Sequence, residues 1–124
     1  MTTRHLGNAG EDMAVAYLTT LGWTILERNY TCRYGELDIV ALPDDQRADV
    51  LAFIEVKFRA RTFFGTGLEA VTVAKQRKVS LAATHWMSER RQQLDAAGAH
   101  RPHVRFDVMD IGPAGVRDHV MGAW

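Results

Sequence analysis

A nine-residue run, Val50 to Phe58, is apolar at every position except Glu55 and Lys57. A short apolar run of this kind predicts a buried β-strand. Alternate residues of a strand point to the same face, so the two charged residues share a face with Leu51 and Phe53. Charged side chains are almost never fully buried unless they are paired. The strand must therefore meet a compensating group here: a salt bridge, a metal ion or a cleft.

The rest of the pattern predicts an α/β fold with the order α-β-β-β-α-β. We expect helices over 8–21 and from 69 or 72 to 94, strands over 23–30, 36–42, 50–58 and 103–111, and a short further strand over 116–121. Short connections between the first three strands predict antiparallel neighbours, and the long second helix predicts a crossover to a parallel fourth strand. Residues 1–124 have the length of one domain, with a mixed central β-sheet flanked by helices.

The composition indicates the cellular compartment of the protein. Its one cysteine, Cys32, can form no internal disulfide, which fits a reducing compartment. No apolar stretch approaches the roughly 18 residues of a membrane span, and the first residues lack the pattern of a secretion signal. We therefore expect a cytoplasmic protein with no membrane partner.

Charge is unevenly distributed although the formal net charge is zero. Residues 57–91 carry eight Lys or Arg against two Asp or Glu, whereas residues 1–56 carry four against nine. A concentrated basic segment attracts phosphate even in a neutral protein. A solvated helix face is the alternative explanation.

A hairpin through the polar loop 43–49, centred between residues 46 and 47, sets Asp38 opposite Glu55. Directly opposed side chains lie about 4.5–5.5 Å apart at Cβ. Two carboxylates at that separation repel each other and favour a cation between them. Mg²⁺ prefers oxygen ligands of this kind, with Mn²⁺ as a substitute, and the backbone carbonyl of Val56 would add another oxygen.

Lys57 lies on the same strand face and would stand beside a metal-bound water. There it would orient the nucleophile or neutralise charge on a phosphate. An ordinary ion network is the competing explanation: it would join Glu36 to Lys57, and Arg33 or Arg59 to Asp38. The spacing alone does not decide between the two.

Two further carboxylates could extend this cluster. Glu11 lies on the apolar stripe of the first predicted helix, and packing of that stripe on the sheet would aim it toward the same face. If Asn8 caps the helix, however, Glu11 is the third residue of a capping-box-like pattern. Asp107 could join the acidic site from the neighbouring strand or pair with Arg105 or Arg28, and we favour the pairing.

An ordered set of short motifs spans residues 7 to about 111. Its pieces are Gly10-Glu11 with Ala14 and Leu18, Arg28-Asn29-Tyr30, Gly35-Glu36-Leu37-Asp38-Ile39-Val40-Ala41, Phe53-Ile54-Glu55-Val56-Lys57 with Arg59, Phe64-Gly65, Lys75-Gln76-Arg77-Lys78 and Arg105-Phe106-Asp107-Val108. The set resembles the YraN family of uncharacterised bacterial proteins. That family is similar to the PD-(D/E)XK nucleases, near the archaeal Holliday-junction resolvases.

The resemblance implies a restriction-endonuclease-like core, whose element order agrees with the order predicted above. It also implies that Asp38 and Glu55 bind the metal, that Lys57 is the catalytic lysine, and that Glu11 matches the helix-borne glutamate of the resolvase-like branch. A homodimer is a further implication, because a four-way junction presents two symmetric strands. In one departure from the superfamily pattern, Leu37 stands where a proline usually precedes the aspartate.

These observations favour a Mg²⁺-dependent phosphodiesterase, an endonuclease that cuts DNA, including branched DNA, by attack of a metal-activated water. Arg59, Lys75, Arg77 and Lys78 are the residues expected to hold flanking phosphates. Two alternatives stay open: a nucleic-acid-binding module without catalysis, and an RNA-processing nuclease, since the fold also resembles the tRNA-endonuclease-like group.

Overall fold

The computed structural model describes residues 3–43, 50–59, 71–96, 98 and 102–124. The elements are α1 (Thr3–Thr20), β1 (Thr24–Cys32), β2 (Gly35–Leu42), β3 (Val50–Phe58), α2 (Val73–Glu89), α3 (Arg91–Ala96), β4 (His103–Gly112) and β5 (Gly115–Val120). This confirms the predicted α/β class and element order. The predicted loop 43–49 lies almost wholly outside the described residues. None of the described helices combines the length and the apolar character needed to cross a membrane.

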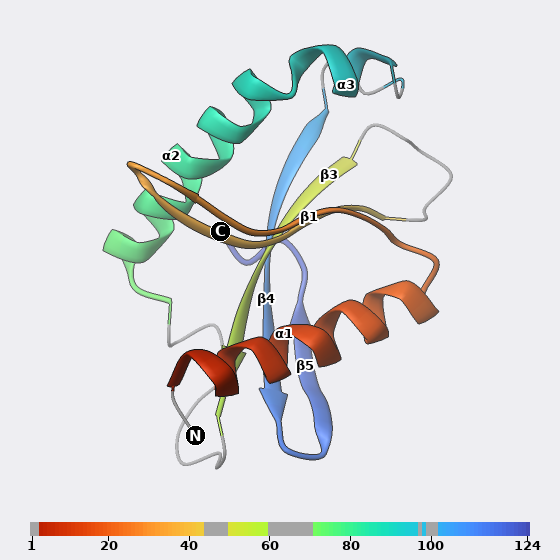
Figure 1. Ribbon diagram of the computed structural model, residues 1–124, viewed down its shortest axis with the longest axis vertical. Coiled ribbons are helices and arrows are strands. Elements are labelled where there is room, and N and C mark those ends of the chain that lie inside the picture. Colours follow the sequence, from red (N-terminus) through yellow and green to blue (C-terminus); the bar gives the residue numbers. More distant parts are fainter. Residues whose placement is uncertain (1–2, 44–49, 60–70, 97, 99–101) are drawn as a thin grey trace.

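The five strands form one open mixed sheet in the order β1-β2-β3-β4-β5. Only β3 and β4 are parallel, because the α2–α3 segment carries the chain back across the sheet between them. The other neighbouring pairs are antiparallel. Helix α1 covers one face of the sheet and α2 covers the other (Figure 1). The predicted mixed sheet flanked by helices is therefore confirmed.

Strand β3 lies at the centre and contributes to both cores. Leu51 and Phe53 pack with Trp86 beneath α2, whereas Ala52 and Ile54 pack in the cluster beneath α1. Burial on both faces explains why this strand is almost continuously apolar. Beyond Phe53, the α2 face of the strand carries Glu55 and Lys57 in place of apolar residues.

Strand β2 follows β3 for only part of its length. The two strands pair at Ile39 with Ile54 and over the two following positions of β2. Toward its start, β2 continues with β1 alone, as a curved two-stranded ribbon (Figure 1). Asn29 of β1, which stands between the pairs on either side of Asp38, has φ 54°. Asn tolerates this left-handed conformation better than most residues, and it bends the ribbon next to Asp38.

Two predicted helix boundaries were wrong. Helix α1 begins at Thr3, so Asn8 lies inside it and is not its N-cap. The long second helix is interrupted at Arg90, whose backbone leaves helical geometry while its N–H bonds to the carbonyls of Trp86 and Met87. No glycine or proline marks that point in the sequence, which is why the pattern suggested one helix.

Candidate functional site

Asp38 and Glu55 lie side by side where β2 leaves β3. The register of Ile39 with Ile54 is the one predicted from the loop, and it confirms the expected position of the two carboxylates. Asp38 Oδ2 accepts a 2.8 Å hydrogen bond from the Val56 N–H, the residue that follows Glu55 in β3. Glu55 is only 4% exposed. The structure therefore places an acidic pair between β2 and the central strand, with Glu55 buried and Asp38 partly buried.

Burial is the main influence on the protonation of this pair. It raises the pKa of Glu55 to about 7, and the neighbouring Asp38 charge adds to the rise, while Lys75 and Lys57 oppose it. Burial also raises the pKa of Asp38, against the lowering effect of the Val56 N–H and the same lysines. Near neutral pH the pair thus favours a shared proton or a bound cation over two free negative charges.

Two lysines from different elements converge on one oxygen of Glu55. Lys75 Nζ, in the first turn of α2, lies 3.4 Å from Glu55 Oε1, and Lys57 Nζ lies 3.8 Å from the same atom. Lys57 thus stands beside the acidic pair, as its place in the strand predicted. Lys75 was expected to hold a flanking phosphate, but its ammonium lies on the carboxylate pair. The crossover that starts α2 next to β3 decides this, and no spacing in the sequence reveals it.

Glu11 approaches from the other side of the sheet. Helix α1 packs on the face opposite α2, so the expectation that Glu11 shares the face of Glu55 is wrong. Its carboxylate is buried and accepts a 2.9 Å hydrogen bond from Arg28 Nε. Burial raises the pKa of Glu11, and the charge of Asp38 adds to that rise. Glu11 therefore lies within electrostatic reach of Asp38, at the bend of the β1–β2 ribbon.

A further carboxylate, Asp110, was missed by the sequence analysis. It stands beside Lys57 in the parallel β3–β4 ladder and is 5% exposed. Arg59 Nη2 lies 2.9 Å from Asp110 Oδ2, and Arg117 Nη1 lies 3.8 Å from Oδ1. Arg59 therefore pairs with Asp110, whereas the ion-network alternative named Arg33 or Arg59 as the partner of Asp38. This one buried acid therefore holds two guanidinium groups on the strand next to Lys57.

Arg117 reaches Asp110 because β5 carries a bulge. Val116 pairs with Ile111 and Asp118 pairs with Asp110, which leaves Arg117 as the extra residue. Bulges redirect side chains and often occur next to active sites. Gly112 provides the space, since a Cβ at that position would lie 2.5 Å from Arg117 Nε. A regular alternation of strand residues does not reveal such a contact.

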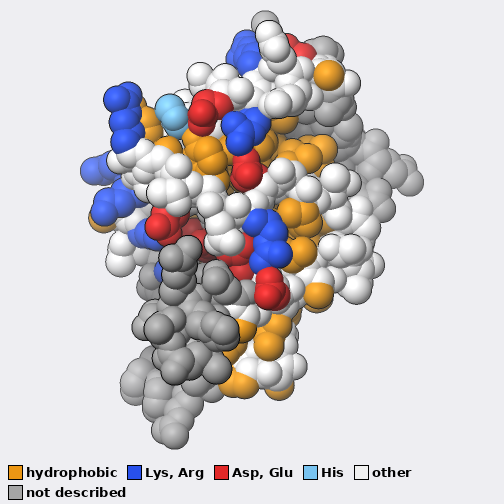
Figure 2. All heavy atoms as spheres, in the orientation of Figure 1, with side chains coloured by type: hydrophobic (Ala, Val, Ile, Leu, Met, Phe, Trp, Pro, Cys, Tyr) orange, Lys and Arg blue, Asp and Glu red, His pale blue; other side chains and the backbone are white. Residues whose placement is uncertain are grey.

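The remaining predicted residues lie around this centre. Arg77 and Lys78 are exposed on α2. Figure 2 shows Lys and Arg side chains gathered along the edge formed by α2 and the tip of the β1–β2 hairpin, with acidic side chains beside them. Asp107 is fully buried and bonded by both Nε and Nη2 of Arg105, which confirms the pairing that we favoured.

The donor set fits a hard cation with few protein ligands. In the described part of the chain no group of three or more His, Cys, Asp and Glu side chains is arranged to hold a metal. The set here is Asp38, Glu55 and the carbonyl of Val56, which points to the same side of the strand as the N–H that binds Asp38. Mg²⁺ is commonly held by one or two carboxylates, with waters and substrate phosphate completing its shell.

The raised pKa of Glu55 predicts how the metal-free protein responds to pH. The folded protein holds this proton up to about pH 7, whereas the unfolded chain loses it near the ordinary value of 4.5. The contribution of Glu55 to stability should therefore be largest below about pH 4.5 and should fall by on the order of 3 kcal/mol as pH rises through 7. Urea unfolding in chelator, at intervals between pH 5 and 8, measures this.

Glu55→Gln is the matched control for that measurement, because it keeps the size of the side chain and removes the titration. The difference in unfolding free energy between wild type and variant should widen with pH over this range. A difference that stays constant would contradict the assigned environment of Glu55.

Comparison with known proteins places Glu11, Asp38, Glu55, the two lysines and Asp110 within the region matched by one family model. The pattern described as "Uncharacterised protein family UPF0102" matches residues 10–111. A UPF0102 protein from Rhodococcus opacus (strain B4) is 42% identical over 123 residues, which cover 96% of this chain and 95% of the relative. One from Myxococcus xanthus (strain DK1622) is 40% identical over 124 residues, covering 98% and 90%. One from Bifidobacterium longum (strain NCC 2705) is 42% identical over 113 residues, covering 90% and 83%.

Proposed function

The chain belongs to the uncharacterised protein family UPF0102, the YraN family that its motifs resemble, and from its site we propose that it is a Mg²⁺-dependent endonuclease acting on DNA. One observation carries the proposal: the buried Glu55 and the partly buried Asp38 lie side by side, and desolvation raises the pKa of both. Carboxylates placed side by side lower the stability of a fold that holds no cation. Perturbed pKa values at such a cluster are typical of functional sites.

The surrounding charges suit phosphodiester hydrolysis. When bound, Mg²⁺ would activate a water and neutralise charge on the phosphate. Asp38, Glu55 and the Val56 carbonyl would hold it between β2 and β3. The Lys57 ammonium lies 3.8 Å from Glu55 Oε1. From there it would orient the attacking water or stabilise the negative charge that develops on the phosphate. Lys75 would take the same role from the α2 side.

Hydrolysis of the phosphodiester forms one bond to phosphorus and breaks another. The water oxygen forms a bond to phosphorus, the phosphoester P–O bond breaks, and the leaving oxygen takes up a proton. No oxidant or reductant is needed. Arg59, oriented by Asp110, would hold the neighbouring phosphate, while Arg77 and Lys78 would follow the strand along α2. Glu11, bonded to Arg28, would adjust the charge around Asp38 from the α1 side.

The experiment that tests the proposal is cleavage of a panel of labelled substrates. Duplex DNA, a four-way DNA junction and a structured RNA are incubated with the protein in Mg²⁺, in Mn²⁺ or in chelator. We expect DNA cleavage that requires the metal. RNA cut in preference to both DNAs would support the RNA-processing alternative.

Salt-sensitive binding with no cleavage in either metal would instead support a binding module. That alternative has one observation in its favour, because Lys57 and Lys75 both lie within ion-pair distance of Glu55 and could replace a metal there. Light scattering of the same preparations would test the homodimer, in which two sites could act on the two strands of a junction.

A further inference from the structure

The turn between β1 and β2 carries two large side chains that turn geometry does not require. Cys32 pairs with Gly35, which leaves Arg33 and Tyr34 at the tip of the hairpin. Gly35, with φ 152°, supplies the unusual backbone conformation. Tight turns favour Gly, Asn, Asp, Ser and Pro, each for a backbone reason that does not apply to Arg or Tyr. The geometry of the turn therefore does not explain why Arg33 and Tyr34 occupy its tip.

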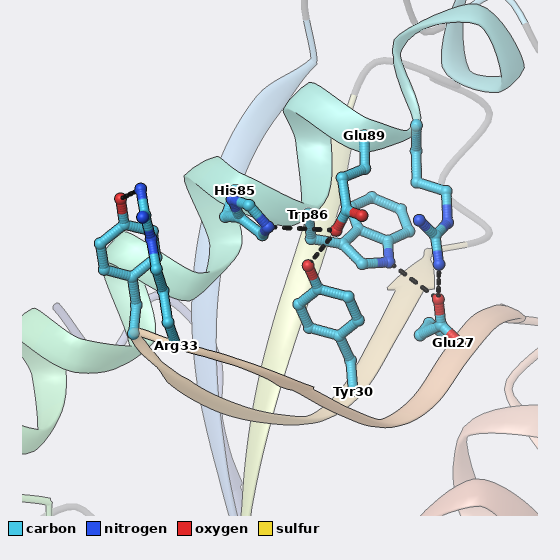
Figure 3. A network of polar contacts seen from close by, with 8 residues as sticks. Glu27, Tyr30, Arg33, His85, Trp86 and Glu89 are labelled. Atoms are coloured by element: carbon cyan, nitrogen blue, oxygen red, sulfur yellow. Dashed lines mark hydrogen bonds and ion pairs between the residues drawn. The ribbon is translucent and has the colours of Figure 1, made fainter.

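These two side chains form a stack that leans on α2. The Arg33 guanidinium carbon lies 4.8 Å from the centre of the Tyr34 ring, and Arg33 Nη2 donates a 2.6 Å hydrogen bond to Tyr34 Oη. The Tyr34 ring meets His85 edge-on at 5.7 Å. Figure 3 shows the Arg33 stack at the hairpin tip, on the side of His85 that faces away from Trp86 and Glu89. Arg33 is exposed, and Tyr34 and His85 are partly exposed.

The polar side chains beside the stack in Figure 3 bond to one another and connect β1 to α2, a role that the stack does not share. The Tyr30 hydroxyl and His85 Nε2 both contact Glu89. Glu27 accepts hydrogen bonds from Trp86 and Arg90, and Trp86 is a core residue. These contacts fix β1 to α2. The carboxylate of Glu89 also repels phosphate, so an approaching nucleic-acid backbone must stay on the opposite side of His85.

Helix α2 connects the stack to the acidic pair. Lys75 touches Glu55, and Lys78 lies against the hairpin, where a Cβ on Gly35 would be 3.5 Å from the Lys78 Cβ. His85 lies two turns farther along the helix. From Lys75 to His85 the helix rises about 15 Å, the length of about four stacked nucleotides. A strand held at the acidic pair could therefore pass Lys78 and reach Tyr34.

On the basis of the proposed function, we propose that Arg33, Tyr34 and His85 form a stacking site for an unpaired base, about four nucleotides from the phosphate at the acidic pair. Within a duplex both faces of a base are covered by its neighbours, so only an unpaired base can stack on a protein ring or guanidinium. The site selects nucleic acids with a single-stranded extension or a branch and requires no particular sequence.

The test measures binding in chelator, where no cut can occur. A DNA duplex with a short single-stranded extension carries the fluorescent base 2-aminopurine at the fourth unpaired position. Wild-type protein should quench this fluorescence. Tyr34→Ala and Arg33→Ala should each abolish most of the quenching and weaken binding about fivefold or more, since stacking contributes at least that much per base. Tyr34→Phe should retain both.

Two controls separate stacking from charge and from folding. Arg91→Ala removes the same charge at an exposed position on α3 and should leave quenching unchanged. A blunt duplex should bind wild type and Tyr34→Ala equally. Quenching that is the same in wild type and Tyr34→Ala would overturn the stacking site, even in a protein that cuts DNA. Quenching that depends on Tyr34 in a protein that cuts nothing would support the site and overturn the proposed cleavage.

Discussion

Replacing Asp38 with alanine is expected to lower metal-dependent DNA cleavage about a thousandfold or more. The variant loses one of two carboxylates that would hold the cation, and the cation would supply both the activated water and much of the charge stabilisation. Initial rates of nicking at saturating DNA, over a series of Mg²⁺ concentrations, measure the effect. Excess metal should recover little of the activity, because the remaining ligands are Glu55 and a backbone carbonyl.

A second substitution separates catalysis from folding. Asp38→Ala also removes the acceptor of the Val56 N–H, whereas Asp38→Asn keeps an oxygen there and removes only the charge. The Asn variant should therefore be equally inactive, and it should be at least as stable as wild type in chelator, because the repulsion from Glu55 is gone.

Glu36→Ala serves as the matched control for this series. Glu36 is an exposed carboxylate two residues away in the same strand, so its loss should change the rate by no more than about threefold. Cleavage by both Asp38 variants at the wild-type rate would refute the assigned site.

Replacing Asp107 with alanine is expected to destabilise the fold by about 3–5 kcal/mol. This carboxylate has no exposed surface, and it accepts hydrogen bonds from Arg105 and from the backbone N–H of Gly122, with His119 Nε2 at 3.0 Å. The surrounding groups lower its pKa despite burial. Removing it leaves the partly buried guanidinium of Arg105 and the imidazole of His119, whose side chain is only 5% exposed, without their shared partner, which is far more costly than losing a surface pair.

Urea unfolding at neutral pH measures this loss, and the melting temperature should fall by roughly 10 °C or more. Asp118→Ala, on the exposed part of β5, is the matched control and should change stability by less than about 1 kcal/mol. A loss below about 1 kcal/mol for Asp107→Ala as well would show that the network contributes little to folding.

The same variant tests the choice between the two roles considered for Asp107. Its partner His119 packs edge-on against Tyr17 of α1, on the sheet face opposite Glu55. At a temperature where the variant remains folded, metal-dependent cleavage should therefore survive. A selective loss of cleavage in a folded Asp107→Ala protein would show that Asp107 belongs to the acidic site after all.

Local patterns were enough to predict the central hairpin. The predicted strand over 50–58 has the same boundaries as β3. The apolar run marks both ends of the strand, and Glu55 and Lys57, the two charged residues inside it, do not interrupt the strand. The register with β2 followed from the position of the polar loop, since a slip of one residue would turn every side chain to the wrong face. The juxtaposition of Asp38 and Glu55 is a consequence of that register.

Contacts between distant elements were predicted less well. Asn8 had the features of an N-cap, yet α1 extends past it to Thr3. Glu11 lies on the apolar side of α1 as expected, but the sequence does not state which face of the sheet that helix covers. Arg90 interrupts the second helix without any residue that breaks helices by propensity. A local preference of a few tenths to about 1 kcal/mol decided none of these three features.

By itself the sequence determined the α/β order, the central strand and the pairing of Asp38 with Glu55, because strand period and loop length fix which side chains face each other. Only the tertiary structure decided that Lys75 joins Lys57 on Glu55, that Asp110 holds Arg59 and Arg117, and that the hairpin tip lies along α2. Those contacts depend on where a crossover helix begins and on a bulge in β5. Neither has a periodic signature, since both arise from packing between segments far apart in the chain.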